Sequence, residues 1–482
     1  MHDHKPEIRR PSPLVSLLPV ASLIAMLAFV ISIFKADSLN GGSQIALIMG
    51  TSICIFISMV FYKVEWKVFE QQLSKTIGDI SITLIILLIV GMLAGSWMIS
   101  GVVPTLIYYG VQILSPRFFL VCACLICALV SVLSGSSWTT IATIGVALMG
   151  IGQALGVSEA WTAGAIISGA YFGDKLSPLS DTTILASSTV RVDIFTHIRY
   201  MLYTTIPSFV IALIIFLISG FVNGGSADID VGNFLHGLSS TFNISLWTLV
   251  VPIATGIMIA RRVPSVITLF LSSLLSGVVA LVLQPDILMQ ISDSDTPGSA
   301  ALAEGVAKSF FGPTAIDTGD VSLNELVSTK GMAGMLNTIW LIVCAMFFGS
   351  AMVASRMVES ITRVIIRLVK GRTGLVGATA STGVLMNVLT GDQFISIVLT
   401  ADIYKNAFAK QCLEPKLLSR TTEDAATVTS VLVPWNTCGM TQATVLGVST
   451  LTYLPYCFFN ILSPLMSVLV AATGWKIKKI KD

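Results

Sequence analysis

The sequence predicts an all-α polytopic membrane protein in which two inverted halves repeat the same five elements. Of its 482 residues, 54% are hydrophobic and only 11% are charged. A water-soluble domain of this size needs more charge to cover its surface. The apolar residues also gather in runs about as long as the ~20 residues that a membrane-spanning helix requires. A third observation, a sequence repeat at one constant spacing, predicts the two halves.

Ten apolar stretches are long enough to be crossings. They cover residues 14–34, 43–62, 79–99, 158–190, 200–222, 242–260, 264–284, 331–354, 421–447 and 456–474. The basic clusters between them can all lie on one side of the membrane, whereas the link at 285–330 is rich in Asp and Glu. Because Lys and Arg mark cytoplasmic loops, we expect both termini in the cytoplasm and the acidic link outside.

Two further apolar stretches, 116–156 and 374–412, are each too long for one crossing and have a polar break at the centre. Such a stretch forms either two full crossings or one re-entrant hairpin, and the charge distribution fits both. The breaks favour hairpins, because their sequences are unlike those of ordinary loops.

The repeat rests on three landmarks with one spacing. Val-Leu-Ser-Gly-Ser at 132–136 recurs as Val-Leu-Thr-Gly-Asp at 388–392, and Leu-Ser-Pro-Leu-Ser at 176–180 recurs as Leu-Val-Pro-Trp-Asn at 432–436. Tyr200 and Tyr456 open the following helices. In every case the shift is 256 residues, which chance matches would not share.

The expected organisation follows from these landmarks. Two N-terminal helices (1–78) precede the first repeat (79–222), which holds the hairpin 116–156 and an unwound segment at 173–183. Two linking helices and an acidic external loop (223–330) lead to the second repeat. That repeat (331–475) holds the hairpin 374–412 and an unwound segment at 434–439, before a basic cytoplasmic tail (476–482). The halves start on opposite sides of the membrane, which is the inverted topology typical of secondary transporters.

The polar breaks are where the chemistry is expected. Unpaired backbone at membrane depth is tolerated only where protein or a water-filled cavity covers it, and freed carbonyl and side-chain oxygens suit a cation such as Na⁺. The candidate cation- and proton-binding residues are Asp181, Asp174, Asp392, Ser134, Ser136, Thr182, Asn436 and Thr437. Within this set, a single Na⁺ site is expected at Ser134, Asp181, Asn436 and Thr437.

The acidic residues differ in how well they suit proton exchange. Asp181 has no adjacent basic residue and is the first choice, with Asp392 next; Asp174 could instead form a structural pair with Lys175. A charge at the bilayer centre costs at least ~2.5 kcal/mol and is rarely idle. The simpler interpretation of each break is a loop at the membrane surface.

Three more titratable residues are given structural roles. Glu423 and Asp424 follow a basic residue at the expected start of a crossing, where acidic side chains are normal helix-capping features. His197 is interpreted as solvated in a basic loop. No phosphate-binding loop, dinucleotide fingerprint or metal-ligand set is found, so we expect no enzyme activity, no cofactor and no nucleic-acid partner.

The residues around the breaks resemble a known family. The run Ala-Gly-Ala-Ile-Ile-Ser-Gly-Ala-Tyr-Phe-Gly-Asp-Lys-Leu-Ser-Pro-Leu-Ser-Asp-Thr-Thr at 163–183 is similar to the signature of the NhaC family of Na⁺/H⁺ antiporters. Gly-Ser-Ser-Trp at 135–138 and Pro-Trp-Asn-Thr at 434–437 fit the same family. The resemblance implies an ion-transporter fold with paired hairpins, an elevator-like movement of a substrate-bearing domain, and often a homodimer.

The predicted function is therefore secondary antiport in a bacterial inner membrane, with Na⁺ (or Li⁺) leaving the cytoplasm in exchange for protons. Because the resembled family includes malate/lactate antiporters, an Na⁺/H⁺-coupled exchanger of small carboxylates or amino acids is the alternative. A channel or a membrane scaffold would leave the matching polar breaks of the two halves unexplained.

Overall fold

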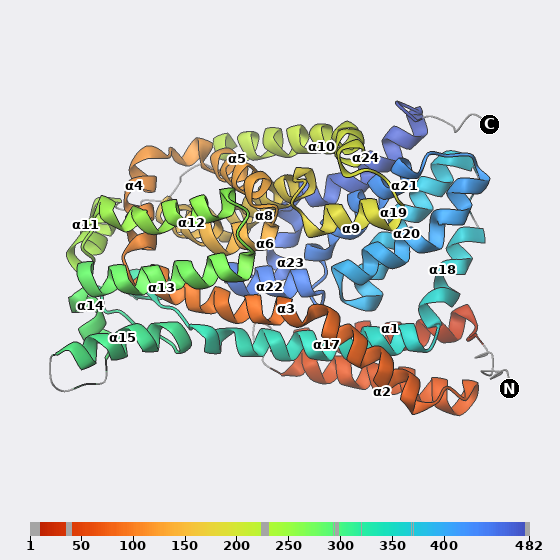
Figure 1. Cartoon of the computed structure of the whole chain (residues 1–482), viewed down its shortest axis with the longest axis horizontal. Coiled ribbons are helices and arrows are strands. Elements are labelled where there is room, and N and C mark those ends of the chain that lie inside the picture. Colours follow the sequence, from red (N-terminus) through yellow and green to blue (C-terminus); the bar gives the residue numbers. More distant parts are fainter. Residues whose placement is uncertain are drawn as a thin grey trace.

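The computed structural model describes residues 10–34, 41–222, 231–292, 294, 298–319, 321–367, 369 and 371–477. Over these residues the chain is almost entirely helical (Figure 1), and the only β-pairing described there is an isolated bridge between Thr314 and Thr329. The predicted all-α class is confirmed.

Seven helical segments in the described part of the chain are long and apolar enough to cross a membrane. They are α1 (Pro13–Phe34), α2 (Gly42–Tyr62), α3 (Trp66–Ile99), α5 (Pro116–Ser134), α10 (Ile194–Val222), α13 (Ser265–Leu283) and the segment Met332–Ala354, which contains η4 and α17. Two bent helix pairs, at 234–260 and 450–473, raise the number to nine if each pair is one span. The polytopic membrane architecture is thus also confirmed.

The two expected crossings at 158–190 and 421–447 are each divided into short helices. The first consists of α8 (Glu159–Leu176) and α9 (Asp181–Thr189). The second consists of α21 (Pro415–Thr422), η5 (Glu423–Thr427), η6 (Ser430–Leu432) and α22 (Thr437–Leu446). Pro178 and Pro434, which cannot donate a backbone hydrogen bond, lie in the two breaks.

The other helices complete the two apolar stretches and the connections. They are α4 (Val102–Ile113), α6 (Ser137–Thr140), η2 (Ile141–Gly145), α7 (Val146–Ala154), α11 (Val231–Thr241), η3 (Leu246–Leu249), α12 (Val250–Ala260), α14 (Pro285–Ile291), α15 (Ser299–Phe311), α16 (Val321–Val327), η4 (Met332–Met335), α17 (Leu336–Ala354), α18 (Met357–Arg367), α19 (Gly371–Thr390), α20 (Gln393–Lys410), α23 (Thr450–Tyr453), η7 (Leu454–Tyr456) and α24 (Phe458–Thr473).

Two groups of helices flank the breaks. Helices α1, α2, α3 and α17 pack side by side along one edge of the molecule in Figure 1 and share a core that includes Leu47 and Phe348. Helices α5, α8, α10 and α24 pack together on the other side of the breaks around Phe119, Ile166 and Phe216. The second break is buried or half-buried between these groups, whereas the first is exposed at Pro178 and Asp181, so irregular backbone there needs water or protein to satisfy it.

A sharp turn ends the first helix of each apolar stretch. Gly135 follows α5 with φ +67°, and Gly391 follows α19 with φ +68°, a conformation that glycine adopts without steric cost. The next residues, Ser136 and Asp392, cap the following helices by accepting backbone hydrogen bonds. The two turns lie 256 residues apart in the sequence.

The hydrogen bonds of the two turns repeat with the same spacing. The Ser134 hydroxyl lies 3.2 Å from that of Thr140, as the Thr390 hydroxyl lies 3.1 Å from that of Ser396. Each turn also contacts the break that follows it. A β-carbon on residue 135 would lie 2.6 Å from the Leu179 Cβ, and one on residue 391 would lie 3.3 Å from the Trp435 carbonyl oxygen. Two similar turn–break junctions result.

Candidate cation-binding site

The first junction contains a buried carboxylate, Asp174, in the last turn of α8. Its side chain is held across the junction, because the Ser137 hydroxyl donates a 2.7 Å hydrogen bond to Asp174 Oδ2. Ser180, the N-cap residue of α9, lies close enough to Asp174 to interact with it electrostatically. Asp174 is only 6% exposed, so its charge is shielded from bulk water and must be compensated inside the protein.

Further oxygen atoms extend this contact into the second half of the chain. The hydroxyls of Ser180 and Thr182 lie 3.0 Å apart, and Thr182 donates to Glu423 Oε1 at 3.3 Å. Glu423 is fully buried and interacts electrostatically with Asp174. The result is a group of five neighbouring oxygen-bearing side chains: Ser137, Asp174, Ser180, Thr182 and Glu423. We call this set the oxygen chain.

A local irregularity in the second broken crossing positions its acidic residues. Residues Glu423–Thr427 form a π-helix between α21 and η6. A π-helical turn inserts an extra residue into the helix and is frequent at functional sites. Glu423 and the next residue, Asp424, are both fully buried here.

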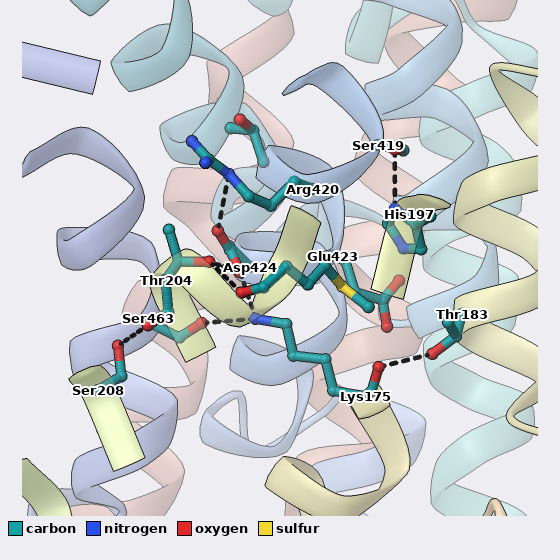
Figure 2. Close-up of polar contacts among 12 residues, drawn as sticks. Lys175, Thr183, His197, Thr204, Ser208, Ser419, Arg420, Glu423, Asp424 and Ser463 are labelled. Atoms are coloured by element: carbon teal, nitrogen blue, oxygen red, sulfur yellow. Dashed lines mark hydrogen bonds and ion pairs between the residues drawn. The ribbon is translucent and has the colours of Figure 1, made fainter. Parts of the chain in front are cut away.

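A buried ion pair adjoins the oxygen chain (Figure 2). The Lys175 ammonium donates to Asp424 Oδ1 and to the Ser463 hydroxyl, the latter at 3.1 Å. Asp424 Oδ1 also accepts a 3.1 Å hydrogen bond from Thr204. Both charged side chains have no exposed surface, so each depends on the other for its charge compensation.

Two more polar side chains lie beside this pair in Figure 2. Arg420 Nε is 3.8 Å from Asp424 Oδ2, and the guanidinium stacks over the Tyr200 ring with 4.7 Å to its centroid. None of the three Arg420 nitrogen atoms has a hydrogen-bond partner in the described part of the chain. His197 Nδ1 lies 2.8 Å from the Ser419 hydroxyl.

The charges in this region do not cancel. Three buried carboxylates, on Asp174, Glu423 and Asp424, face two basic groups, on Lys175 and Arg420. With all five groups ionised, their formal charges sum to −1, which a single monovalent cation would neutralise. Among the described residues, no three His, Cys, Asp or Glu side chains converge as metal ligands. Hydroxyl oxygens with a carboxylate at each end suit a weakly directional cation better than a transition metal.

The second junction holds a separate polar cluster around Asp392, which is 1% exposed. Thr437 donates to Asp392 Oδ2 at 3.3 Å. Asn436 caps α22 by accepting from the Cys438 amide at 3.1 Å, and its amide nitrogen lies 3.3 Å from Asn387 Oδ1. Asp392 forms no ion pair with the described basic residues.

The structure divides the predicted site residues between the two junctions. Asp174 and Thr182 belong to the oxygen chain, whereas Thr437 contacts Asp392 and Asn436 contacts Asn387 and Thr437. Ser134 and Ser136 make hydrogen bonds within their own turn. The Asp181 side chain is exposed at the start of α9. The placement of a single cation among all these residues stays a prediction.

The structure corrects the roles given to several neighbouring residues. Lys175 pairs with Asp424 and not with Asp174. Glu423 and Asp424 are not capping residues at a surface, because α21 extends the helix before them and is itself buried from Leu417 onward. His197 is not solvated, because α10 begins at Ile194 and residue 197 is on its buried face.

Ser137, Ser180 and Glu423 were missed by the sequence interpretation. Ser137 and Ser180 directly adjoin predicted residues, so the whole polar break was the available signal. Glu423 could have been suspected from the run Thr-Thr-Glu-Asp-Ala-Ala-Thr at 421–427, which opens an otherwise apolar stretch. No local pattern connects it to Asp174.

Buried carboxylates at turn–break junctions, within a bundle of membrane-spanning helices, define an ion-coupled membrane transporter. The chain belongs to the Na⁺/H⁺ antiporter family, whose model matches residues 8–190 and 169–475. The family predicted from the sequence is therefore confirmed.

Curated relatives cover nearly the whole chain. The chain is 37% identical to the Na⁺/H⁺ antiporter NhaC of Alkalihalophilus pseudofirmus, over 89% of this chain and 90% of that protein. It is 34% identical to the malate-2H⁺/Na⁺-lactate antiporter of Bacillus subtilis, over 89% of each. It is also 34% identical to the arginine/ornithine antiporter ArcD of Halobacterium salinarum, over 98% of this chain and 94% of that protein.

Proposed function

We propose that this protein is a secondary antiporter that exchanges Na⁺, or Li⁺, for protons at the oxygen chain. The observation that carries the proposal is the burial of three carboxylates, on Asp174, Glu423 and Asp424, beside only two basic groups, which gives a formal charge of −1 when all are ionised. One Na⁺ or one H⁺ neutralises this charge, but both together would leave the buried region positive. Mutual exclusion at one site is the requirement for coupled antiport.

The neighbouring hydroxyls explain why the same site could bind Na⁺ as well as a proton. Dehydration of Na⁺ must be offset by several oxygen atoms at close range, and Ser137, Ser180 and Thr182 supply them beside the two carboxylates. A proton needs only one carboxylate oxygen. The proton-bound state therefore leaves the hydroxyls hydrogen-bonded to each other, as they are between Ser180 and Thr182.

Asp181 has a different role in this scheme. Its side chain is exposed one residue before Thr182, and an exposed carboxylate facing lipid would be costly. We propose that it faces water and attracts cations toward the oxygen chain. The cluster of Asp392, Asn436 and Thr437 is the matching element of the second half.

The membrane arrangement is proposed from the same features. The two halves would be related by an axis in the membrane plane, with Gly135 over Gly391 and Pro178 over Pro434. Both termini would be in the cytoplasm of a bacterial cell, since the basic clusters lie in the loops between crossings. A homodimer is the assembly proposed for the elevator-like movement.

The decisive experiment is exchange in proteoliposomes that contain the purified chain. We expect Na⁺ or Li⁺ added on one side to dissipate a preset pH gradient without any organic substrate. Asp174→Asn and Glu423→Gln should abolish this response, while Asp402→Asn, on the exposed side of α20, should leave it intact. Normal exchange in both site variants would contradict the proposal.

An exchanger of small carboxylates or amino acids is the second candidate function. Arg420 favours it, because a buried guanidinium without a hydrogen-bond partner among the described residues could bind a carboxylate bidentately. Two of the relatives are named for malate/lactate and arginine/ornithine exchange. Na⁺ movement that starts only after malate, lactate or an amino acid is added would favour this function over simple Na⁺/H⁺ exchange.

A further inference from the structure

The ion pair between Lys175 and Asp424 is not required by the fold. Two consecutive charged residues of α8, Asp174 and Lys175, face two consecutive acidic residues of η5, Glu423 and Asp424. Burying such a pair seldom stabilises a protein relative to apolar residues of similar volume. Its presence therefore needs another explanation.

The repeat provides an internal comparison. At the 256-residue spacing, Lys175 corresponds to Val431 and Asp424 corresponds to Ser168. Both counterparts are fully buried and uncharged. The same positions in the other half are thus filled without any charge, so the pair has no general structural role in these helices.

The Lys175–Asp424 pair lies where it changes the net charge around the oxygen chain. Lys175 follows Asp174 directly and interacts electrostatically with Glu423 as well as with Asp424. Besides these carboxylates, the charged and titratable groups around it are Arg420 from α21, His197 and Tyr200 from α10 and Asp181 from α9. Removing the Lys175 charge alone would leave two uncompensated negative charges instead of one.

We infer that Lys175, held by Asp424, is a positioning residue that limits the oxygen chain to one exchangeable cation. This inference rests on the proposed exchange at Asp174 and Glu423. Lys175 does not bind Na⁺ itself. It occupies Asp424 through the ion pair, so that a proton or Na⁺ is taken up only by the remaining carboxylates.

A charge-balance test follows. In the Lys175→Met variant the oxygen chain should bind protons more tightly, because a second negative charge stays in the buried region. The pH at which Na⁺-driven exchange reaches half its maximum should then rise by about one unit or more, the size of shift that a nearby charge produces. The double variant Lys175→Met/Asp424→Asn restores a single excess charge, and its midpoint should return to within about 0.3 pH units of the wild-type value.

The double variant keeps the test decisive even if Lys175→Met does not fold, because it replaces both partners of the buried pair. A folded double variant that is inactive, or whose pH midpoint stays shifted, would overturn the inference. So would a Lys175→Met variant that transports with the wild-type pH profile. If the wild-type protein itself shows no Na⁺/H⁺ exchange, the proposed function fails instead, and the two failures are distinguishable.

Discussion

The two turn–break junctions have the same backbone design but place their carboxylates on opposite partners. In the first junction the carboxylate is on the break side, at Asp174 in the last turn of α8, and Ser137, directly after the turn, supplies the hydroxyl. In the second junction the carboxylate is on the turn, at Asp392, and the break supplies the Thr437 hydroxyl. At the 256-residue spacing, Asp174 corresponds to Ser430 and Asp392 corresponds to Ser136.

The swapped positions of the carboxylates show which side-chain properties the fold requires and which only the chemistry requires. Ser136 and Asp392 both cap a helix by accepting a backbone hydrogen bond. Ser and Asp are about equally good N-cap residues, so capping explains the oxygen atom but not the charge. The buried charge in each junction is therefore additional to what the turn needs. The junctions also differ in surroundings, because only the first adjoins a buried ion pair among the described residues.

The largest effect should distinguish the two carboxylates. We expect Asp174→Asn to lower the rate of Na⁺-dependent exchange by at least about 100-fold, a loss of ~2.7 kcal/mol. Asp392→Asn should lower it by about 10-fold, because Asn preserves the cap and the oxygen chain remains intact. Initial rates of proton movement in proteoliposomes would measure both.

The comparison of exchange rates is valid only if both variants fold as the wild-type protein does. Both variants should elute as the wild-type protein does in size-exclusion chromatography and unfold within a few degrees of it. If the two folded variants lose exchange equally, the junctions contribute equally and the asymmetry drawn from the ion pair is wrong.

The sequence was sufficient for the features that depend on local chemistry. Long apolar runs identify membrane helices, and glycine at the turns together with proline in the breaks marks where helices end. The 256-residue spacing depends only on such local signals, which is why Gly135 and Gly391 lie in matching turns with positive φ.

Contacts between segments that are distant in the sequence could not be predicted from local sequence patterns. Thr182 and Glu423 are 241 residues apart, and nothing in either local pattern specifies their pairing. The basic residues before Glu423 were interpreted as a cytoplasmic cluster, so the acids after them were assigned to capping. The buried pairing of Arg420 and Lys175 with Asp424 shows that charge near an apolar stretch can be compensated internally instead of by water.

An intermediate effect should come from the turns themselves. Alanine at either glycine would adopt an unfavourable positive φ, which costs about 1 kcal/mol. Gly135→Ala should be destabilised by about 1–3 kcal/mol more, because its β-carbon would lie 2.6 Å from Leu179 Cβ, whereas the nearest contact at residue 391 is 3.3 Å. Thermal unfolding in detergent would measure the difference. Equal stability losses would mean that the first junction relaxes as readily as the second.

The smallest effect should come from single hydroxyls. Thr182→Val keeps the shape of the side chain but removes the donor to Glu423, and Thr437→Val does the same opposite Asp392. A hydrogen bond to a charged group contributes ~1.5–3 kcal/mol in a buried site, but water or a shifted neighbour replaces part of it. We therefore expect Thr182→Val to raise the KM for Na⁺ by about 5-fold while the maximal rate changes less, and Thr182→Ser to restore it. Thr437→Val should change this KM by less than about 2-fold, because its hydroxyl lies outside the oxygen chain. A larger effect from Thr437 than from Thr182 would move the principal Na⁺ contacts to the second junction, and Asp392 would then replace Asp174 as the carboxylate that couples Na⁺ to protons.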